Sequence, residues 1–185
     1  IPEEPSALKQ QNPIEIYASD GKTLISKIQP EGGVRTVVES NRISSHMKDA
    51  LVSAEDRTFW DNPGVSFKGI ASAALKHIKK DPTAGGGSTV TQQLVKNTLV
   101  GDEYSMDRKV KEALSSMKLT ASWTKEDIIT AYLNTIYFGR GSLGIEEASQ
   151  SYFGVHAAEL NPSQSALIAG IIQAPSEYDP INNRK

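Results

Sequence analysis

Two adjacent carboxylates, Glu55 and Asp56, follow directly on a helical apolar pattern and lead into Arg57, Phe59 and Trp60. A carboxylate at the edge of an apolar helix can act as a general acid or base when its surroundings adjust its protonation. The same pattern also fits an ordinary solvated helix end. The stretch by itself does not decide between these two interpretations.

A second group of charged residues lies in the stretch SMDRKVKEAL, where Arg108 and Lys109 fall in the first turn of an expected helix. Cations in the first turn interact unfavourably with the helix dipole, so the stability of the helix does not explain why they are there. An anionic ligand would explain it. Glu112 follows Arg108 by four residues and Lys109 by three. A routine intrahelical ion pair therefore explains the group equally well.

A glycine run, 85–87, leads into STVTQQLVKN and a helix start with Thr89 and Gln92 at capping-box spacing. Backbone N–H groups at such a start make an anion site. Gln92 and Lys96 add a donor and a cation on the face of Thr89. A flexible linker before a capped helix fits the same residues, and no Gly-Lys-[Ser/Thr] closes the loop as in a nucleotide P-loop.

Together these segments supply carboxylates at Glu55 and Glu112 and cations at Lys96, Arg108 and Lys109. That set suits a sugar diphosphate, because cations can stabilise a leaving pyrophosphate while one glutamate serves as the base. Nothing in the spacing proves that the segments converge.

Composition excludes several other classes of function. A net charge of −2 gives no reason to expect nucleic acid, and the absence of cysteine excludes disulfides and thiolate metal sites. The three histidines are far apart and in no ligand spacing. Ser115–Lys118 fits the Ser-x-x-Lys of penicillin-binding transpeptidases, but the companion Ser-x-Asn and Lys-Thr-Gly elements are absent, as is Gly-x-Ser-x-Gly.

The elements that must position these residues are mostly helices. Residues 1–13 form a Pro-rich leader, and two alternating runs around Asp20-Gly21 predict a β-hairpin. From residue 44 onward the apolar period is helical. We expect helices near 45–54, 66–80, 105–122, 125–139 and 144–152, one after Thr89 and one after Asn161. The fold class is therefore mainly α with a small N-terminal β-hairpin.

Two of these helices carry specific expectations. The 66–80 helix is basic and amphipathic, so it either covers the core or rests on an anionic membrane surface. The 105–122 helix is expected to bury Val110, Leu114, Met117 and Ala121. The longest apolar run, 166–172, is shorter than the roughly 18 residues of a membrane span and is expected to be a buried helix.

Five longer motifs resemble, in order, the peptidoglycan glycosyltransferase domain (glycosyltransferase family 51) of class A penicillin-binding proteins and monofunctional transglycosylases. They span about 100 of the 185 residues. The motifs are EDRTFWDNPG (55–64), GGSTVTQQLVKN (86–97), RKVKE (108–112), KEDIITAYLNTIYFG (125–139) and RGSLGIEEASQSYFG (140–154).

The resemblance implies a lysozyme-like, two-lobed domain over residues 14–185, cut from a longer chain whose N-terminal helix anchors it at the extracytoplasmic face of the bacterial cytoplasmic membrane. It implies polymerisation of lipid II, with inversion to a β-1,4 link and release of undecaprenyl diphosphate. Lipid II, the growing lipid-linked glycan, the membrane surface and moenomycin-type inhibitors are the implied partners. A divalent cation such as Mg²⁺ is the implied cofactor.

The resemblance also assigns roles to individual residues. Glu55 matches the general base, and Glu112 the second glutamate, which assists at the diphosphate side. Lys96, Arg108 and Lys109 match the diphosphate-binding positions, and Ser88, Gln92 and Asn97 are their polar neighbours.

Three positions depart from the family pattern. Relatives usually carry His at Asn62, often Glu at Thr130 and many of them Asn at Arg140. None of the three is a proposed base, so we expect retained chemistry, although the hydrogen bonding that fixes the first motif can differ at Asn62.

Two alternatives use the same residues. A hydrolase or lytic transglycosylase would use a glutamate as general acid, but it needs no diphosphate site, so the cations favour transfer. A non-catalytic lipid-diphosphate-binding domain would not need the Glu55 carboxylate.

Overall fold

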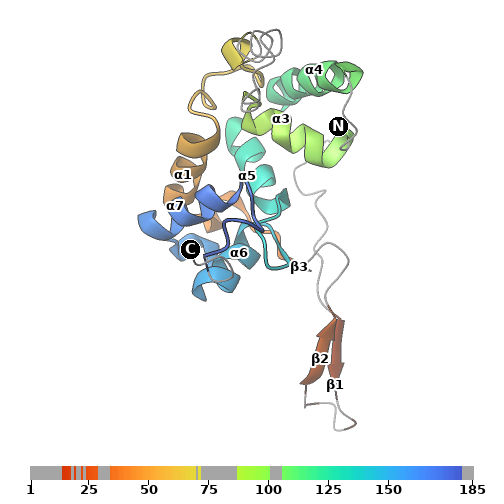
Figure 1. Ribbon diagram of the computed structural model, residues 1–185, viewed down its shortest axis with the longest axis vertical. Coiled ribbons are helices and arrows are strands. Elements are labelled where there is room, and N and C mark those ends of the chain that lie inside the picture. Colours follow the sequence, from red (N-terminus) through yellow and green to blue (C-terminus); the bar gives the residue numbers. More distant parts are fainter. Residues whose placement is uncertain are drawn as a thin grey trace. The chain divides into compact units, whose positions relative to one another are not determined.

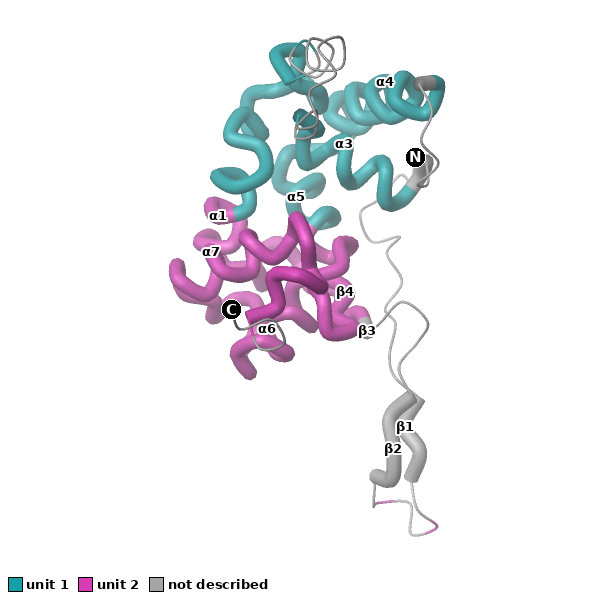
Figure 2. The backbone as a smooth tube through the Cα atoms, viewed as in Figure 1, with its two compact units in different colours: residues 1–5, 51–132 teal, residues 6–50, 133–185 magenta. Residues whose placement is uncertain are grey.

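The computed structural model describes residues 14–17, 19, 22, 24–28, 34–69, 71, 87–100 and 106–180. Most of the described residues are helical (Figure 1), so the mainly α class is confirmed. No helix in these ranges is long and apolar enough to cross a bilayer. The chain divides into two compact units, residues 1–5 with 51–132 (unit 1) and residues 6–50 with 133–185 (unit 2), coloured separately in Figure 2.

The predicted hairpin is confirmed. Strands β1 (Ile14–Tyr17) and β2 (Leu24–Ile28) pair antiparallel, with Ile14 opposite Ile28 and a register irregularity between Ile16 and Tyr17. A second, parallel pair joins β3 (Val34–Arg35) to β4 (Ser142–Leu143) within unit 2.

Unit 1 holds the residues expected to do chemistry. Its helices are the last part of α1 (Ser45–Glu55), α3 (Val90–Val95), α4 (Met106–Ser122) and most of α5 (Lys125–Thr135). A π-helix, η3 (Lys96–Val100), continues α3 directly. The fully or almost fully buried apolar side chains of unit 1 include Leu51, Phe59, Val65, Val90, Leu94, Ile128, Ile129 and Tyr132.

Helix α4 lies where the sequence predicts it, but the expected buried face is wrong. Val110, Leu114 and Met117 are 55%, 63% and 41% exposed, and Ala121 is exposed as well. The buried side of α4 carries instead four residues of which three are polar: Arg108, Glu112, Ser116 and Leu119. The reason is that Glu112 bonds to Gln92 of α3, which turns the polar side of α4 inward.

Unit 2 contains the short helices η2 (Ser40–Arg42) and η4 (Ala157–Glu159) together with α6 (Ile145–Phe153) and α7 (Pro162–Ile171). Local sequence signals set the ends of α6 and α7. Gly154 closes α6 in the left-handed conformation, and Asn161 caps α7 through a capping box with Gln164, with Pro162 first in the helix. Only one side of α7 is buried, because Ala166 and Leu167 are exposed.

Helix α5 ends at Thr135, four residues before the predicted end at Gly139. The backbone beyond it bonds elsewhere: the Gly144 N–H donates to the Ile136 carbonyl, and the Phe138 N–H donates to the Ser142 carbonyl. These contacts replace the helical ones, so the chain turns back toward β4.

Two polar contacts hold the later part of unit 2 together. Arg140, with a left-handed φ of 54°, donates to both carboxylate oxygens of Asp179 (3.0 and 2.6 Å) and lies over the Tyr152 ring. Glu146 on α6 accepts a hydrogen bond from the Ala157 N–H at 2.9 Å. Its Oε1 lies 2.6 Å from His156 Nδ1. Burial would raise the pKa of Glu146, but these hydrogen bonds outweigh it and hold the pKa below its usual value.

The basic helix expected over 66–80 falls mostly outside the described residues. Phe67, near the start of the expected helix, is described and is 66% exposed.

Candidate active site

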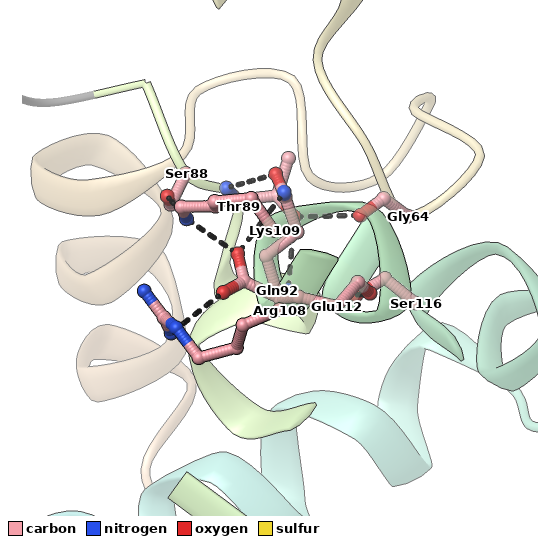
Figure 3. Close-up of polar contacts among 8 residues, drawn as sticks. All are labelled: Gly64, Ser88, Thr89, Gln92, Arg108, Lys109, Glu112 and Ser116. Atoms are coloured by element: carbon pink, nitrogen blue, oxygen red, sulfur yellow. Dashed lines mark hydrogen bonds and ion pairs between the residues drawn. The ribbon is translucent and has the colours of Figure 1, made fainter. Parts of the chain in front are cut away.

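The carboxylate of Glu112 is the centre of a buried charged cluster in unit 1 (Figure 3). Glu112 is 1% exposed and accepts hydrogen bonds from Lys109 Nζ at 2.6 Å, Arg108 Nη1 at 3.2 Å and Gln92 Nε2 at 3.3 Å. An unpaired buried carboxylate would be strongly destabilising, so these three donors compensate for its burial. Two cations and one amide donor therefore meet at a single carboxylate.

The orientation of Gln92 follows from the start of α3. Thr89 and Gln92 form the predicted capping box: the Gln92 N–H donates to Thr89 Oγ1 at 3.1 Å, and the Thr89 N–H donates to Gln92 Oε1 at 3.2 Å. Thr89 Oγ1 in turn donates to the Gly64 carbonyl at 2.7 Å. Because its amide oxygen is used by the cap, the Gln92 Nε2 is left to donate to Glu112.

The start of α3 is not the open anion site that the glycine run predicted. The Val90 N–H donates to Asp56 Oδ2 at 3.3 Å, and the Gln92 N–H is used by the Thr89 cap. The anion at this helix start is therefore the protein's own Asp56.

Glu55, the last residue of α1, is half-buried and bonds to the neighbouring glutamine of α3. Gln93 Nε2 donates to Glu55 Oε2 at 2.8 Å, and the Tyr132 hydroxyl of α5 donates to Gln93 Oε1 at 2.8 Å. The other oxygen, Oε1, is also buried and has no hydrogen-bond partner among the described residues. Adjacent glutamines of one short helix therefore hold both candidate glutamates: Gln92 bonds to Glu112, and Gln93 to Glu55.

Asp56 anchors the first motif to α3. Its carboxylate is 7% exposed and accepts hydrogen bonds from the Thr58 N–H and hydroxyl, from Asn62 Nδ2 and from the Val90 N–H. The side chain thus has a full set of structural partners. Asp56 therefore orients the chain beside Glu55.

Asn62, where relatives usually carry His, is fully integrated in this network. Its Nδ2 lies 3.2 and 3.0 Å from the two Asp56 oxygens, while its Oδ1 accepts from the Gly64 N–H at 2.9 Å and from Lys125 Nζ at 3.2 Å. Lys125 also lies over the Phe59 ring at 4.8 Å, and burial lowers its pKa although nearby carboxylates oppose this. Asparagine therefore supplies both a donor and an acceptor at this position.

The remaining predicted residues are placed as follows. Ser88 Oγ accepts a hydrogen bond from Lys109 Nζ at 3.1 Å, which joins it to the Glu112 cluster. Lys96 is half-buried at the start of the π-helix η3, and Asn97 is exposed one residue later. Five predicted residues thus meet through direct contacts: Ser88, Gln92, Arg108, Lys109 and Glu112.

Sequence reasoning missed Gln93 and Tyr132. Gln93 has no signal of its own in the sequence, because its neighbour Gln92 already fits the capping box. Tyr132 lies in the apolar pattern of α5, which favours a core position, and its ring does lie in the core at 0% exposure. A polar group at the tip of a buried tyrosine requires a partner, and that requirement was the signal available in the sequence.

Comparison with known proteins identifies the family. The family model described as "Transglycosylase" matches residues 21–185. Penicillin-binding protein 1A of Mycolicibacterium smegmatis is 42% identical over 96% of this chain and 23% of its own length. Penicillin-binding protein 2a of Streptococcus pneumoniae is 40% identical over 80% of this chain and 20% of its own length. The crystal structure of penicillin-binding protein 1A from Haemophilus influenzae matches 94% of this chain and 16% of that chain at 23% identity, with a TM-score of 0.48.

The chain therefore belongs to the transglycosylase family and is a peptidoglycan glycosyltransferase domain. It spans less than a quarter of the length of the relatives named above.

Proposed function

We propose that this domain polymerises lipid II into glycan strands, with Glu55 as the general base. The observation that carries the proposal is the pair of adjacent glutamines on α3. Gln93 bonds to the candidate base, and Gln92 bonds to the carboxylate that gathers two cations. A base and a cation cluster, each bonded to a glutamine of this short helix, are the two parts that transfer from a sugar diphosphate requires.

In the proposed step, Glu55 removes the proton from the 4-hydroxyl of the acceptor GlcNAc. The hydroxyl oxygen attacks the anomeric carbon of the donor MurNAc, and the bond from that carbon to the diphosphate oxygen breaks. Undecaprenyl diphosphate leaves, and attack from the opposite face yields the β-1,4 link. The buried Glu55 Oε1, which has no partner among the described residues, supports the role of proton acceptor.

The leaving diphosphate is proposed to bind Lys96, Arg108 and Lys109, with Ser88, Gln92 and Asn97 as polar neighbours. The first turn of α4 supports this role, because its two cations oppose the helix dipole. At 1% exposure Glu112 has little surface to offer a substrate, so we assign it the task of holding Arg108 and Lys109 in place.

A divalent cation remains an expectation from the family. The described residues do not fit a magnesium site held by the protein. Glu112 already accepts from three donors, two of them cationic, and no group of three potential ligands occurs in the described part of the chain. Mg²⁺ favours carboxylates that can be shared with substrate phosphates. We therefore derive no step through a metal ion.

Contact with the membrane surface is supported by the exposed side of α4. Val110, Leu114 and Met117 form an apolar stripe at 41–63% exposure, the side chains that the sequence pattern had assigned to the core. A lipid-linked substrate brings such a stripe close to the bilayer. We propose that the domain works at the extracytoplasmic face of the cytoplasmic membrane, held by an N-terminal helix, and that moenomycin-type inhibitors compete for the diphosphate site.

The deciding experiment supplies purified protein with lipid II in detergent and measures glycan polymer. We expect Glu55→Gln to lower the rate at least about a hundredfold, the scale of general-base catalysis. Glu39→Gln, at an exposed glutamate of unit 2, is the matched control. Polymer at the wild-type rate from Glu55→Gln would rule out the base assignment, and shortening of preformed glycan would favour the lytic alternative.

Lys96→Ala and Arg108→Ala test the diphosphate site in the same assay. Each removes a charged partner of the phosphates, so donor affinity and turnover should fall together by roughly tenfold or more. Lys118→Ala, at an exposed lysine of α4, is the control. Unchanged affinity for a lipid diphosphate in both variants would contradict the site.

Liposome binding tests the membrane contact. Leu114→Ser should weaken binding to anionic vesicles, while Leu167→Ser, at an exposed leucine of α7, should not. Charge reversal at Lys76 and Lys79 should weaken binding at low salt. Equal binding of wild type and Leu114→Ser would exclude the stripe as the contact.

A further inference from the structure

We propose that Tyr132 is a positioning residue for the base: its hydroxyl fixes the amide of Gln93, and that amide fixes the carboxylate of Glu55. The proposal rests on the proposed role of Glu55. It assigns Tyr132, in the middle of an apolar helix pattern, a task beyond packing.

Two hydrogen bonds link α5 to α3 and α3 to α1, and each is donated toward Glu55. The Tyr132 hydroxyl of α5 lies 2.8 Å from Gln93 Oε1, and Gln93 Nε2 of α3 lies 2.8 Å from Glu55 Oε2 at the end of α1. All three side chains belong to unit 1.

The chemistry of the three groups determines which of them donates and which accepts in these two hydrogen bonds. An ionised carboxylate only accepts, so Gln93 must turn its NH₂ toward Glu55 and its carbonyl toward Tyr132. The hydroxyl must then be the donor. Without it, only the Glu55 carboxylate would orient the Gln93 amide, and the amide would be held at one end instead of two.

Tyr132 is suited to be a constant donor. Its ring is 0% exposed, and burial, with the Glu55 charge adding to it, raises the pKa of the phenol far above its usual value. The hydroxyl therefore keeps its proton at any pH at which the enzyme works. The buried ring also leaves little freedom for the hydroxyl to move away from Gln93.

The consequence for Glu55 is an asymmetric carboxylate. Oε2 is held by Gln93, whereas Oε1 is buried with no partner among the described residues. A carboxylate fixed at one oxygen presents the other in a defined direction, which is the requirement for a base that must meet a single hydroxyl.

Two variants test the relay. Tyr132→Phe removes only the hydroxyl, and Gln93→Met removes the donor to Glu55 at similar side-chain volume. Both variants change the hydrogen bonding that fixes the Glu55 carboxylate, so the dependence of kcat on pH should change in both. We expect kcat to fall about three- to tenfold in Tyr132→Phe and roughly ten- to a hundredfold in Gln93→Met, with KM little changed.

Tyr152→Phe is the matched control, because it removes a tyrosine hydroxyl that donates to the Phe138 carbonyl in unit 2. It should leave the pH profile unchanged. Thermal unfolding of each variant shows whether it is folded, and if Tyr132→Phe fails to fold, Gln93→Met still tests the link to Glu55.

A direct NMR measurement separates this inference from the proposed function. The Glu55 carboxyl carbon is followed in the chain without substrate, and the signal that Glu55→Gln removes identifies it. A changed chemical shift of this signal in both Tyr132→Phe and Gln93→Met, with no change in Tyr152→Phe, supports the relay whatever Glu55 does in catalysis. An identical chemical shift in wild type and both variants would overturn the relay, even if Glu55→Gln is inactive.

Discussion

The hydrogen bonds around Asp56 allow a specific prediction, because donor and acceptor roles in them are fixed. Every described partner of the Asp56 carboxylate is a donor: the Thr58 N–H and hydroxyl, Asn62 Nδ2 and the Val90 N–H. Asp56→Asn keeps the shape of the side chain but turns one acceptor into an NH₂ group. In either orientation of the new amide, a donor then faces donors.

The size of the effect follows from the contacts. With the amide nitrogen in the place of Oδ2, the bonds from Asn62 at 3.0 Å and from Val90 at 3.3 Å are lost. Asn62 cannot rotate to compensate, because its Oδ1 already accepts from Gly64 and Lys125. Two bonds to a buried carboxylate at about 1.5–3 kcal/mol each suggest a loss of about 3–6 kcal/mol. That is a large share of the roughly 5–15 kcal/mol that stabilises a typical domain.

A residue swap provides the matched test. Asn62→Asp alone places a second carboxylate about 3 Å from Asp56, so it should also destabilise unit 1. In the double variant Asp56→Asn/Asn62→Asp, the new Asn donates to the new Asp, which still accepts from Gly64 and Lys125. We expect the double variant to be about 2 kcal/mol more stable than the sum of the single changes.

Urea unfolding followed by tryptophan fluorescence measures these changes. Both tryptophans of the sequence, Trp60 and Trp123, belong to unit 1, so the signal reports on the unit that carries the network. Equal m-values across the four proteins would show that stability alone has changed. A loss below about 1 kcal/mol in Asp56→Asn, or a double variant no more stable than the sum, would refute the polarity argument.

Two further predictions concern other parts of the chain. Gly64→Ala should lower the free energy of unfolding by at least about 2 kcal/mol, because its φ is +92° and a Cβ there would overlap the Ser116 carbonyl. Gly170→Ala is the control, since open space surrounds that position, and it should be neutral or slightly stabilising. Equal melting temperatures for the two variants would contradict this prediction. The lowered pKa of Glu146 means that its stabilising effect is complete above the usual glutamate value near 4.5 and is lost as the pH falls below it. Glu146→Gln should therefore flatten the dependence of stability on pH between about 5 and 3, and an unchanged slope would show that Glu146 is not responsible.

Sequence reasoning succeeded where the signal is local. The capping box at Thr89 and the helix start after Asn161 were predicted, because each depends on residues within four positions of one another. The ion pairs of Glu112 with Arg108 and Lys109 are local in the same sense, and they too were anticipated.

The failures are all contacts between distant segments. The apolar period of α4 identifies the stripe through Leu114, but it does not determine which side of the helix packs against the core. The bond from Gln92 to Glu112 turns the polar side inward and leaves the stripe exposed. The anion at the start of α3 is Asp56, which lies 34 residues away in sequence. The bonds of Gln93 to Glu55 and to Tyr132 span 38 and 39 residues, and no spacing rule reaches that far.

The order of the two units along the chain has a consequence for synthesis on the ribosome. Unit 1 is mostly one continuous segment, residues 51–132, inserted between the two segments of unit 2. The Asn134 side chain pairs with the Val38 backbone across 96 residues, and the Ser44 hydroxyl bonds to the Leu160 carbonyl across 116. The first segment of unit 2 must therefore wait, without these partners, until residues 134 and 160 have been made. A pause in translation after residue 132 would leave residues 34–50 without these partners, while every segment of the candidate active site has already been synthesised.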